Sequence, residues 1–492
     1  MAKTINHEPS VLRVAVLSRL LVVALILLWR SLFDPYDTSA ALNPPCLGQS
    51  RPSVAPIGRR WAGIAGAIER SVVWDSVYFV RAAECGYEYE QSYAFLPLLP
   101  VSVAALSNSV FSPLVPFIGY RAVLALSGYV LNNVAFVLAA VYFYRLSVLI
   151  LKDTTAALRA SVLFCFNPAS IFYSSIYSES LYALSSIGGV YYLFSGANSV
   201  AVLLLALSGA ARSNGAINAG YICFEGIIRA YVAINQKKRP WLAVQAIIAA
   251  IARSICIFAP FIAFQAYGYF NICRGGTSDD LSPWCKSRIP LLYSYLQSHY
   301  WGVGFLKYFQ LKQLPNFLLA STMLSLSVGS IKEYMSFLPI AFQSLRNEKT
   351  LARILEYNQI SDAQSKGRRS SKTPEGDHIV RRRRQENKEE GSLQDMNPLR
   401  GVTYDLSQGY HSVFVLPFVL HLAFMTFTAF FVMHVQVSTR FLSASPPIYW
   451  FASYLLVSPS LTSRRISYLI CVYFIAYILL GTLLFSNFYP FT

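Results

Sequence analysis

Long apolar runs are the feature that most limits what this chain can fold into. Of its 492 residues 55% are hydrophobic, and only 13% are Asp, Glu, Lys or Arg. Soluble domains carry about 25% charged residues, so a soluble chain of this size could not hide so much apolar surface. Its 33 Phe, 32 Tyr and 7 Trp exclude disordered and collagen-like classes. The sequence therefore predicts an all-α polytopic membrane protein.

Apolar runs long enough to cross a bilayer, about 20 residues each, recur along the chain. The first, 16–33, is interpreted as an uncleaved signal anchor that leaves the N-terminus in the cytosol. Several runs contain Pro, Gly, Ser or Asn, so some are expected to be broken or re-entrant helices packed inside protein. About eleven spans are predicted, at 16–33, 94–111, 117–144, 156–172, 179–195, 199–222, 241–267, 316–341, 411–433, 447–461 and 466–486.

Basic residues orient these spans. The net charge of +17 is first attributed to positive cytosolic loops and not to nucleic-acid binding, and no nucleic-acid partner is expected. Eleven alternating spans place the clusters at 229–239 and 464–465 in the cytosol, together with the charged segment 346–400. The basic residues between 145 and 159 disagree, because they fall on the far side. Either the charge rule is violated there or two neighbouring spans are wrong.

Polar segments divide the chain further. Those assigned to the non-cytosolic face, 34–93, 268–315 and 434–446, are rich in Trp, Tyr, Pro, Asp and Gln, a composition that suits a working surface. The first of these loops is expected to carry short amphipathic helices. The predicted divisions are an N-terminal transmembrane part (1–345), a charged cytosolic loop with the composition of a disordered segment (346–400), and C-terminal transmembrane helices (401–492).

The cysteines give no support for a metal site. None of the eight forms a C-x-x-C pair, and no H-E-x-x-H occurs. The predicted topology puts Cys46, Cys85, Cys273 and Cys285 on the non-cytosolic side and the other four in spans. A disulfide such as Cys273–Cys285 and free buried thiols are equal alternatives. Nucleotide-cradling and G-x-S-x-G motifs are also missing from the sequence.

The segment 73–100 holds the first candidate for chemistry. Trp74 and Asp75 begin a pattern that suggests a short helix lying on the membrane at the non-cytosolic face. Asp75 either caps this helix or serves as a general base at the lipid–water boundary, where partial desolvation would tune its pKa.

Two charged residues lie within apolar spans, where an ionised group costs several kcal/mol. Glu179 and Arg212 either form a structural ion pair or bind substrate, and Asn214 can join the same network. Intramembrane polar groups and broken spans also suit a transporter or lipid scramblase, which is the alternative function.

Ten short blocks of sequence, in order between about residues 74 and 450, make the chain resemble the PIG-V family of mannosyltransferases. The segment 346–400 has the character of an insertion. The blocks are Trp74-Asp75-x-x-Tyr78-Phe79, Gly86-Tyr87-x-Tyr89-Glu90, Ala94-Phe95-x-Pro97-x-x-Pro100, Phe166-Asn167-Pro168-Ala169-Ser170-Ile171-Phe172, Tyr177-Ser178-Glu179-Ser180-Leu181, Arg212-Ser213-Asn214-Gly215, Tyr300-Trp301-x-x-Gly304-Phe305-Leu306, Pro315-Asn316-Phe317, His434-Val435-Gln436 and Arg440-Phe441-Leu442.

The resemblance implies a multi-pass enzyme of the endoplasmic-reticulum membrane with a GT-C-like bundle. Such an enzyme takes mannose from dolichyl-phosphate mannose and adds the second, α1,6-linked mannose of the glycosylphosphatidylinositol (GPI) precursor on the luminal face. A β-linked donor and an α-linked product imply inversion. A lipid monophosphate donor needs no metal to hold a diphosphate, and the chain has no D-x-D motif, so no cofactor is expected. A small membrane-protein partner is implied for some members of the family.

The resemblance also implies roles for residues. The loop 34–93 becomes the catalytic loop, with Asp75 as the general base. Arg440 becomes the group that stabilises the departing phosphate, with an interfacial anchor as its alternative. Trp74 would stack on sugar or shield Asp75, or else anchor the chain in the aromatic belt. The remaining candidates for substrate contact, each with ordinary packing or ion pairing as the alternative, are Glu179, Arg212, Asn214, Gln297, Tyr300, Trp301 and Gln436.

Overall fold

The computed structural model describes residues 6–36, 46–47, 59–274, 282–345 and 409–489. The predicted cytosolic loop 346–400 lies outside the described residues. Helices and turns make up the part that is described, and it contains no strand. The prediction of an all-α membrane protein is therefore confirmed.

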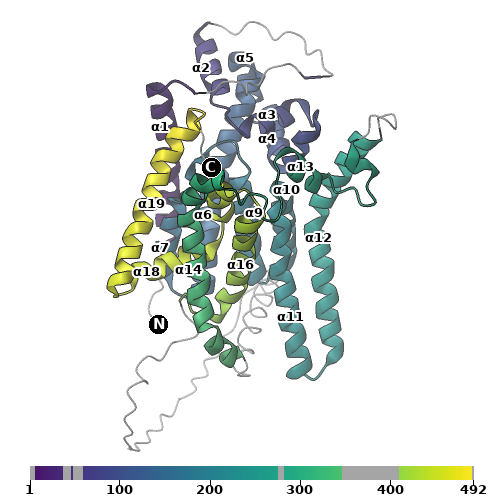
Figure 1. Cartoon of the computed structure of the whole chain (residues 1–492), viewed down its shortest axis with the longest axis vertical. Coiled ribbons are helices and arrows are strands. Elements are labelled where there is room, and N and C mark those ends of the chain that lie inside the picture. Colours follow the sequence, from purple (N-terminus) through teal and green to yellow (C-terminus); the bar gives the residue numbers. More distant parts are fainter. Residues whose placement is uncertain (1–5, 37–45, 48–58, 275–281, 346–408, 490–492) are drawn as a thin grey trace, which may run out of the picture.

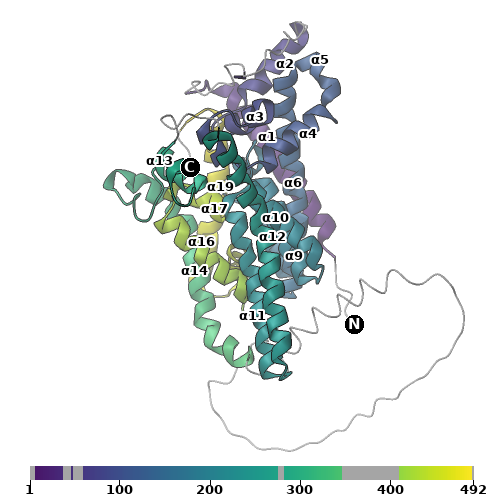
Figure 2. The same ribbon diagram turned by 90° about the vertical axis from the view of Figure 1, so that its right-hand side faces the viewer.

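Long helices form an upright bundle (Figure 1). Its N-terminal end carries the start of the first helix and the connection between α11 and α12. The opposite end carries α3 (Ser76–Cys85), α4 (Leu98–Asn108) and α13 (Leu292–Tyr300) (Figures 1 and 2). We call this opposite end the site end. The long helices are α1 (Glu8–Leu32), α6 (Tyr120–Leu151), α11 (Ala219–Asn235), α12 (Pro240–Cys273), α14 (Leu314–Leu345), α16 (Leu416–Phe431) and α19 (Leu461–Ser486).

Shorter helices fill the interior of the bundle. Residues along α9 and α18 are mostly buried, so neighbouring helices, not lipid, surround them. Helix ends at this depth are tolerated because surrounding protein satisfies their free backbone groups, as the sequence predicted for its broken spans. These helices are α7 (Thr154–Cys165), α8 (Ser170–Ser174), α9 (Glu179–Phe194), α10 (Asn198–Ala211) and α18 (Pro446–Val457).

The prediction of eleven long spans is not confirmed. Seven described helices are long and apolar enough to cross a membrane, or eight if α4 (Leu98–Asn108) and the segment Ser112–Ile118 count as one span. That pair is bent by 64°. The predicted runs 156–172, 179–195, 199–222 and 447–461 hold helices of only 12 to 16 residues, since hydropathy does not separate a lipid-facing helix from a short buried one.

The structure also corrects the disagreement over the basic residues at 145–159. The bent α4 lies at the site end, so α6 runs from the site end to the N-terminal end, where Arg145 forms a 2.6 Å ion pair with Glu8. The residues Ser213–Asn235 add a span that the sequence did not predict, of modest hydropathy 1.2. Of the two alternatives for these basic residues, the structure therefore supports the second, that two neighbouring predicted spans are wrong. The basic residues of the α6–α7 connection, the α11–α12 connection and the start of α19 all lie at the N-terminal end (Figure 1).

One buried cation that the sequence analysis overlooked helps to hold the first helix in the bundle, in addition to the buried apolar face of that helix. Arg19 of α1 is 3% exposed. Its guanidinium donates hydrogen bonds to the Cys165 and Ser170 carbonyls and the Ser174 hydroxyl, each at 3.0 Å, and stacks on Phe136 at 3.9 Å. Neutral acceptors at the α7–α8 break thus satisfy the charge and hold α1 in place.

Cysteine pairing is decided by the structure. Cys46 is bonded to Cys85 at the end of α3 (Ser76–Cys85), and Cys273 is bonded to Cys285. The four predicted span cysteines are free thiols. The short helices α2 (Arg59–Arg70) and α3 also confirm the helical first loop.

The corrected topology predicts which residues share a membrane face. In sealed microsomes, Lys152→Cys should react with an impermeant maleimide from the same side as Arg465→Cys, and Lys312→Cys from the other side. The variants are made in a chain whose four free cysteines are replaced by Ala. Labelling of Lys152→Cys from the side of Lys312→Cys would restore the eleven-span topology.

Candidate functional site

A cavity of about 440 Å³ opens among the helix ends near the site end. The segments that line it are far apart in sequence but all reach this space: the start of α3, the start of α9, the end of α10, α13 (Leu292–Tyr300) and α17 (Ser438–Leu442). The predicted site residues that line it are Trp74, Asp75, Glu179, Arg212, Asn214, Gln297, Trp301, Gln436 and Arg440. The structure thus brings nearly the whole predicted set into one place.

Asp75 precedes α3, but its side chain does not cap the helix. One carboxylate oxygen instead accepts a hydrogen bond from Arg440 at 3.2 Å, and the Asp75 backbone N–H donates to the Tyr177 hydroxyl at 3.1 Å. The Asp75 side chain keeps 36% of its surface exposed. The capping interpretation is therefore wrong for this residue, which presents a usable carboxylate to the cavity.

Trp74 holds Asp75 in place at a cost in backbone strain. Its φ of 55° lies in the left-handed region, which costs a non-glycine residue about 1–2 kcal/mol. The indole N–H donates to the Phe485 carbonyl at 3.2 Å, and the ring packs on Phe488. The end of α19 thus fixes the turn that aims Asp75 at the cavity.

Four charged groups form a continuous network. Glu179 is paired with Arg212, and the same oxygen, Oε1, lies 3.6 Å from Arg440 Nε. Arg440 also contacts Asp75, so two carboxylates balance two guanidiniums. The Glu179 side chain is only 2% exposed, and an isolated carboxylate there would be very costly. The ion-pair interpretation of Glu179 and Arg212 is correct, and both residues also line the cavity.

Local sequence explains why these charges meet. Pro168 cannot continue α7, and the Asn167 side chain accepts a hydrogen bond from the Ala169 N–H, which stabilises the break. Glu179 then starts α9 and Arg212 ends α10. Each charge complements the dipole of its helix.

The return after α10 needs a glycine. A Cβ at Gly215 would lie 2.1 Å from the Ser208 carbonyl. The chain can therefore fold back over the end of α10 only with glycine at this position, and Asn214 enters the cavity as a result.

Besides Arg440 Nε, which lies 3.6 Å from Glu179 Oε1, two buried polar atoms of cavity-lining residues lack hydrogen-bond partners among the described residues. They are Glu179 Oε2 and Asn214 Nδ2. Buried polar atoms without a partner cost about 1–3 kcal/mol each. They are a carboxylate acceptor and an amide donor, the groups that bind hydroxyl-rich ligands.

Arg440 remains a cation in this setting. Burial acts to lower the pKa of Arg440, but attraction to Asp75 and Glu179 outweighs burial and raises it. The guanidinium also packs on Phe172 and Tyr177, at 5.3 and 5.5 Å from the ring centroids. It is a fixed positive charge at the cavity wall and not an interfacial anchor.

Tyr300 does not line the cavity, in contrast to the prediction. It is 41% exposed, and its hydroxyl donates to Glu90 at 2.8 Å. Glu90 also accepts hydrogen bonds from the Ser282 hydroxyl and the Trp284 N–H, both at 2.7 Å. Glu90 therefore holds the wall that presents Gln297 and Trp301. Its appearance in the Gly-Tyr-x-Tyr-Glu block was the available signal.

A second wall was also overlooked. His434 Nε2 lies 2.6 Å from the Trp301 carbonyl oxygen, and its ring stacks on Tyr308. The Tyr308 hydroxyl donates to Gln436 Oε1 at 2.7 Å. Gln436, which lines the cavity, is thus held by its side-chain oxygen.

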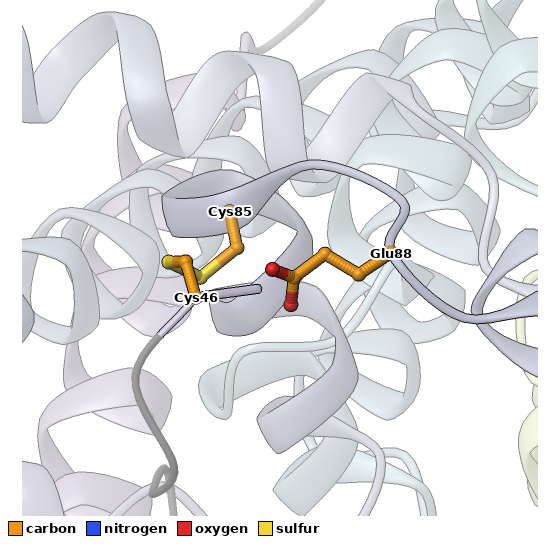
Figure 3. A group of neighbouring side chains, drawn as sticks. All are labelled: Cys46, Cys85 and Glu88. Carbon is orange, nitrogen blue, oxygen red and sulfur yellow. A yellow bond between two sulfur atoms is a disulfide. The ribbon is translucent and has the colours of Figure 1, made fainter. Parts of the chain in front are cut away.

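One group of described side chains has the spacing of a metal site, namely Cys46, Cys85 and Glu88 (Figure 3). Its two sulfurs form a disulfide, so they are not thiolate ligands. Glu88 is bound by Arg81 at 2.6 Å. These residues do not fit a metal, and the expectation of a metal-free reaction stays a prediction.

Comparisons with known proteins agree with the resemblance. A family described as Mannosyltransferase (PIG-V) matches residues 7–492. The chain is 30% identical to GPI alpha-1,6-mannosyltransferase 2 of Mus musculus, over 91% of this chain and 84% of the mouse protein. Identity to the Homo sapiens protein of the same name is 29%, over 92% and 85%. GPI mannosyltransferase 2 of Drosophila melanogaster is 30% identical, over 85% and 86%.

No solved structure matches the chain. The GT-C-like assignment of the bundle therefore stays a prediction.

Loss of the buried carboxylate should destabilise the protein. Glu179→Gln leaves Arg212 and Arg440 without their shared countercharge, and we expect a loss of about 3–5 kcal/mol in the free energy of unfolding. Asp75→Asn, at a more exposed carboxylate, should cost less than about 1 kcal/mol. Denaturant unfolding of the purified chain in detergent measures both. Equal losses would show that Glu179 does not organise the network.

Acid should destabilise the cavity wall that Glu90 holds next to α13. Burial acts to raise the pKa of Glu90, but hydrogen bonds from Ser282, Trp284 and Tyr300 outweigh burial and lower it from 4.5. A lowered folded pKa contributes stability above pH 4.5, and this is lost as the pH falls through the folded pKa. The melting temperature of wild type should therefore drop more steeply below about pH 4.5 than that of Glu90→Gln. If the melting temperatures of the two proteins fell equally with pH, the proposed stabilising role of Glu90 would be contradicted.

Proposed function

Because this chain belongs to the PIG-V family of mannosyltransferases, we propose that it adds the second mannose, in α1,6 linkage, to the GPI-anchor precursor. It is a glycosyltransferase, and this sets aside the transporter and scramblase alternative. The proposed donor is dolichyl-phosphate mannose, and the proposed acceptor is the lipid-linked GPI intermediate. The site end faces the lumen of the endoplasmic reticulum in this proposal.

The observation that supports a mechanism is the contact between Asp75 and Arg440 in one cavity. An inverting transfer needs a base for the acceptor 6-hydroxyl and a group to stabilise the departing phosphate. Asp75 accepts the hydroxyl proton as the oxygen attacks the anomeric carbon. The bond from that carbon to the phosphate oxygen breaks on the opposite face, and the lipid phosphate leaves with the electron pair.

Asp75 is a better candidate for the base than Glu179. The Asp75 side chain is 36% exposed and makes one ion pair, so an acceptor can reach it. Glu179 is 2% exposed, and its Oε1 is shared by two arginines. Glu179 therefore holds Arg212 and Arg440 at the cavity wall.

Arg440 is suited to the phosphate. It is a permanent cation with a planar set of donors, which binds phosphate oxygens bidentately. A bound phosphate competes with Asp75 for the guanidinium. Donor binding would therefore release an Asp75 lone pair for the acceptor proton, and this couples the two halves of the reaction. Phosphate needs only such electrostatic stabilisation to depart, which is why no metal is proposed.

Charge and cysteine placement support the luminal orientation. Basic connections collect at the N-terminal end, as cytosolic ends do. The two disulfides pair cysteines of loops that we assign to the other side, and disulfides persist in oxidising compartments such as the endoplasmic-reticulum lumen. A small membrane partner is kept as part of the proposal on the strength of the family resemblance.

Asp75→Asn tests the mechanism. Microsomes that carry wild type should convert a one-mannose GPI intermediate to a two-mannose product with radiolabelled dolichyl-phosphate mannose. The variant should be at least about 100-fold slower at matched expression, because a positioned general base contributes about 10²–10⁴-fold.

Asp153→Asn is the matched control. Asp153 caps α7 through the Thr155 and Ala156 N–H groups, and Asn caps as well as Asp. This variant should keep wild-type activity. Full activity of Asp75→Asn would move the base elsewhere, with Glu179 next. No product from wild type, even with its partner proteins co-expressed, would contradict the proposed reaction.

A further inference from the structure

A second cavity, of about 360 Å³, lies between α11 and α12, away from the active site. The two helices form an antiparallel hairpin at the edge of the bundle, and its turn is at the N-terminal end (Figure 1). Apart from Lys237, which lies in the connection between the two helices, the lining residues come from one face of each helix. This cavity plays no part in the proposed transfer, so its contents must be explained separately.

Three of the four charged side chains in its lining are cations. Arg229 and Lys237 come from the α11 side, Arg253 comes from α12, and Glu225 is the only acid in the lining. Glu225 is already paired with Arg229. No ion pair is found for Arg253 within the described ranges. The cavity thus carries an excess of two positive charges.

The position of Arg253 makes this excess costly. It lies about 20 Å along α12 from Pro240, at about 1.5 Å per residue, inside a helix whose apolar window has a hydropathy of 2.2. A lone cation at such depth costs about 2.5–3.5 kcal/mol on insertion scales. A charge of this kind is usually retained because something pairs with it.

Helix geometry aims the two arginines at one space. Side chains of a helix lean toward its N-terminus, so Arg253 leans toward the turn and Arg229 leans away from it. The helices run antiparallel, and a Cβ at Gly226 would lie 2.6 Å from the Ala250 Cβ. Gly226 and Ala250 therefore lie side by side. Arg229 follows Gly226 on the side toward the turn, and Arg253 follows Ala250 on the side away from the turn. Small residues at this level, including Ala246 and Ala249, leave room between them.

The surroundings indicate a lipid. Only 17% of the apolar window of α12 is buried, and large exposed apolar side chains flank the cavity, among them Ile227, Ile234 and Ile248. An occupant therefore needs an anionic group for the arginines and apolar chains for the flanks. Basic pockets between transmembrane helices at the cytosolic side bind anionic lipid head groups.

We propose that the α11–α12 cavity binds the head group of an anionic phospholipid from the leaflet at the N-terminal end, with Arg253 as the contact of the phosphate and Lys237 as a second cation of the lining nearer the turn. Arg229, already paired with Glu225, narrows the site. The same phosphate chemistry could come from free phosphate in solution, and the test separates the two sources. This site is independent of the proposed transfer reaction.

The test uses the purified full chain, stripped of lipid in detergent. Binding of phosphatidylinositol and of phosphatidylcholine with the same acyl chains is titrated by native mass spectrometry. Phosphatidylinositol should bind wild type more tightly. Each neutralised cation should weaken binding about fivefold, the equivalent of ~1 kcal/mol, so Lys237→Gln with Arg253→Gln should lose about 25-fold.

Arg464→Gln with Arg465→Gln is the matched control. It removes the same charge at the same end of the bundle, from residues outside the cavity, and should bind phosphatidylinositol within about twofold of wild type. Melting temperatures without lipid check the fold. Arg253→Gln removes an unpaired cation, so it should be no less stable than wild type.

Three results would overturn the proposal. Equal binding of the two lipids by wild type would exclude an anion site. Equal losses of phosphatidylinositol affinity in the test and control variants would show that binding depends on the net positive charge of that end and not on this cavity. Displacement of phosphatidylinositol by millimolar inorganic phosphate would assign the site to free phosphate. Each can occur while mannosyl transfer is unchanged, because none of these residues lines the active site.

Discussion

The ion pairing of the buried Glu179 carboxylate is the interaction on which the candidate site depends. It draws in Arg212 from the end of α10 and Arg440 from α17, and Arg440 in turn contacts Asp75 before α3. Segments far apart in the sequence thus meet around one buried charge, whose burial without a partner would be energetically very costly. Its cost is offset only when both arginines are present, so the network is built as a unit. Asp75, the proposed general base, can then stay partly exposed at the edge of the network.

Broken helices make this arrangement possible. A continuous helix satisfies its own backbone and presents only side chains, whereas a helix end also offers a dipole. Pro168 and Gly215 create such ends inside the bundle. Glu179 and Arg212 occupy them with the favourable sign of charge. The same breaks supply the acceptors that hold Arg19 and, through it, the first helix.

Composition and patterning predicted the membrane class and the helical first loop, and together with the family resemblance they predicted nine residues of the cavity lining. Glu179 was found because charges are rare and costly in apolar sequence, Asp75 because it begins a predicted helix in a polar loop, and Arg440 through the family resemblance. Tyr300 was wrongly included, because a loop position does not reveal which way a side chain faces. Arg19 and Glu90 were overlooked, since each is satisfied by neutral partners that only the fold brings near. The span count failed where short buried helices have the same hydropathy as lipid-facing ones.

The sequence by itself determined that the chain is helical, lies in a membrane, and carries a few charges that must be paired or functional. Hydrophobicity and charge cost are properties of single residues and short windows, so they can be read along the chain. Only the tertiary structure decided the partners: which cysteines pair, that Glu179 serves two arginines, and that Asp75 faces the cavity instead of capping α3. Partnership depends on distances between residues hundreds of positions apart, and these exist only once the helices have packed.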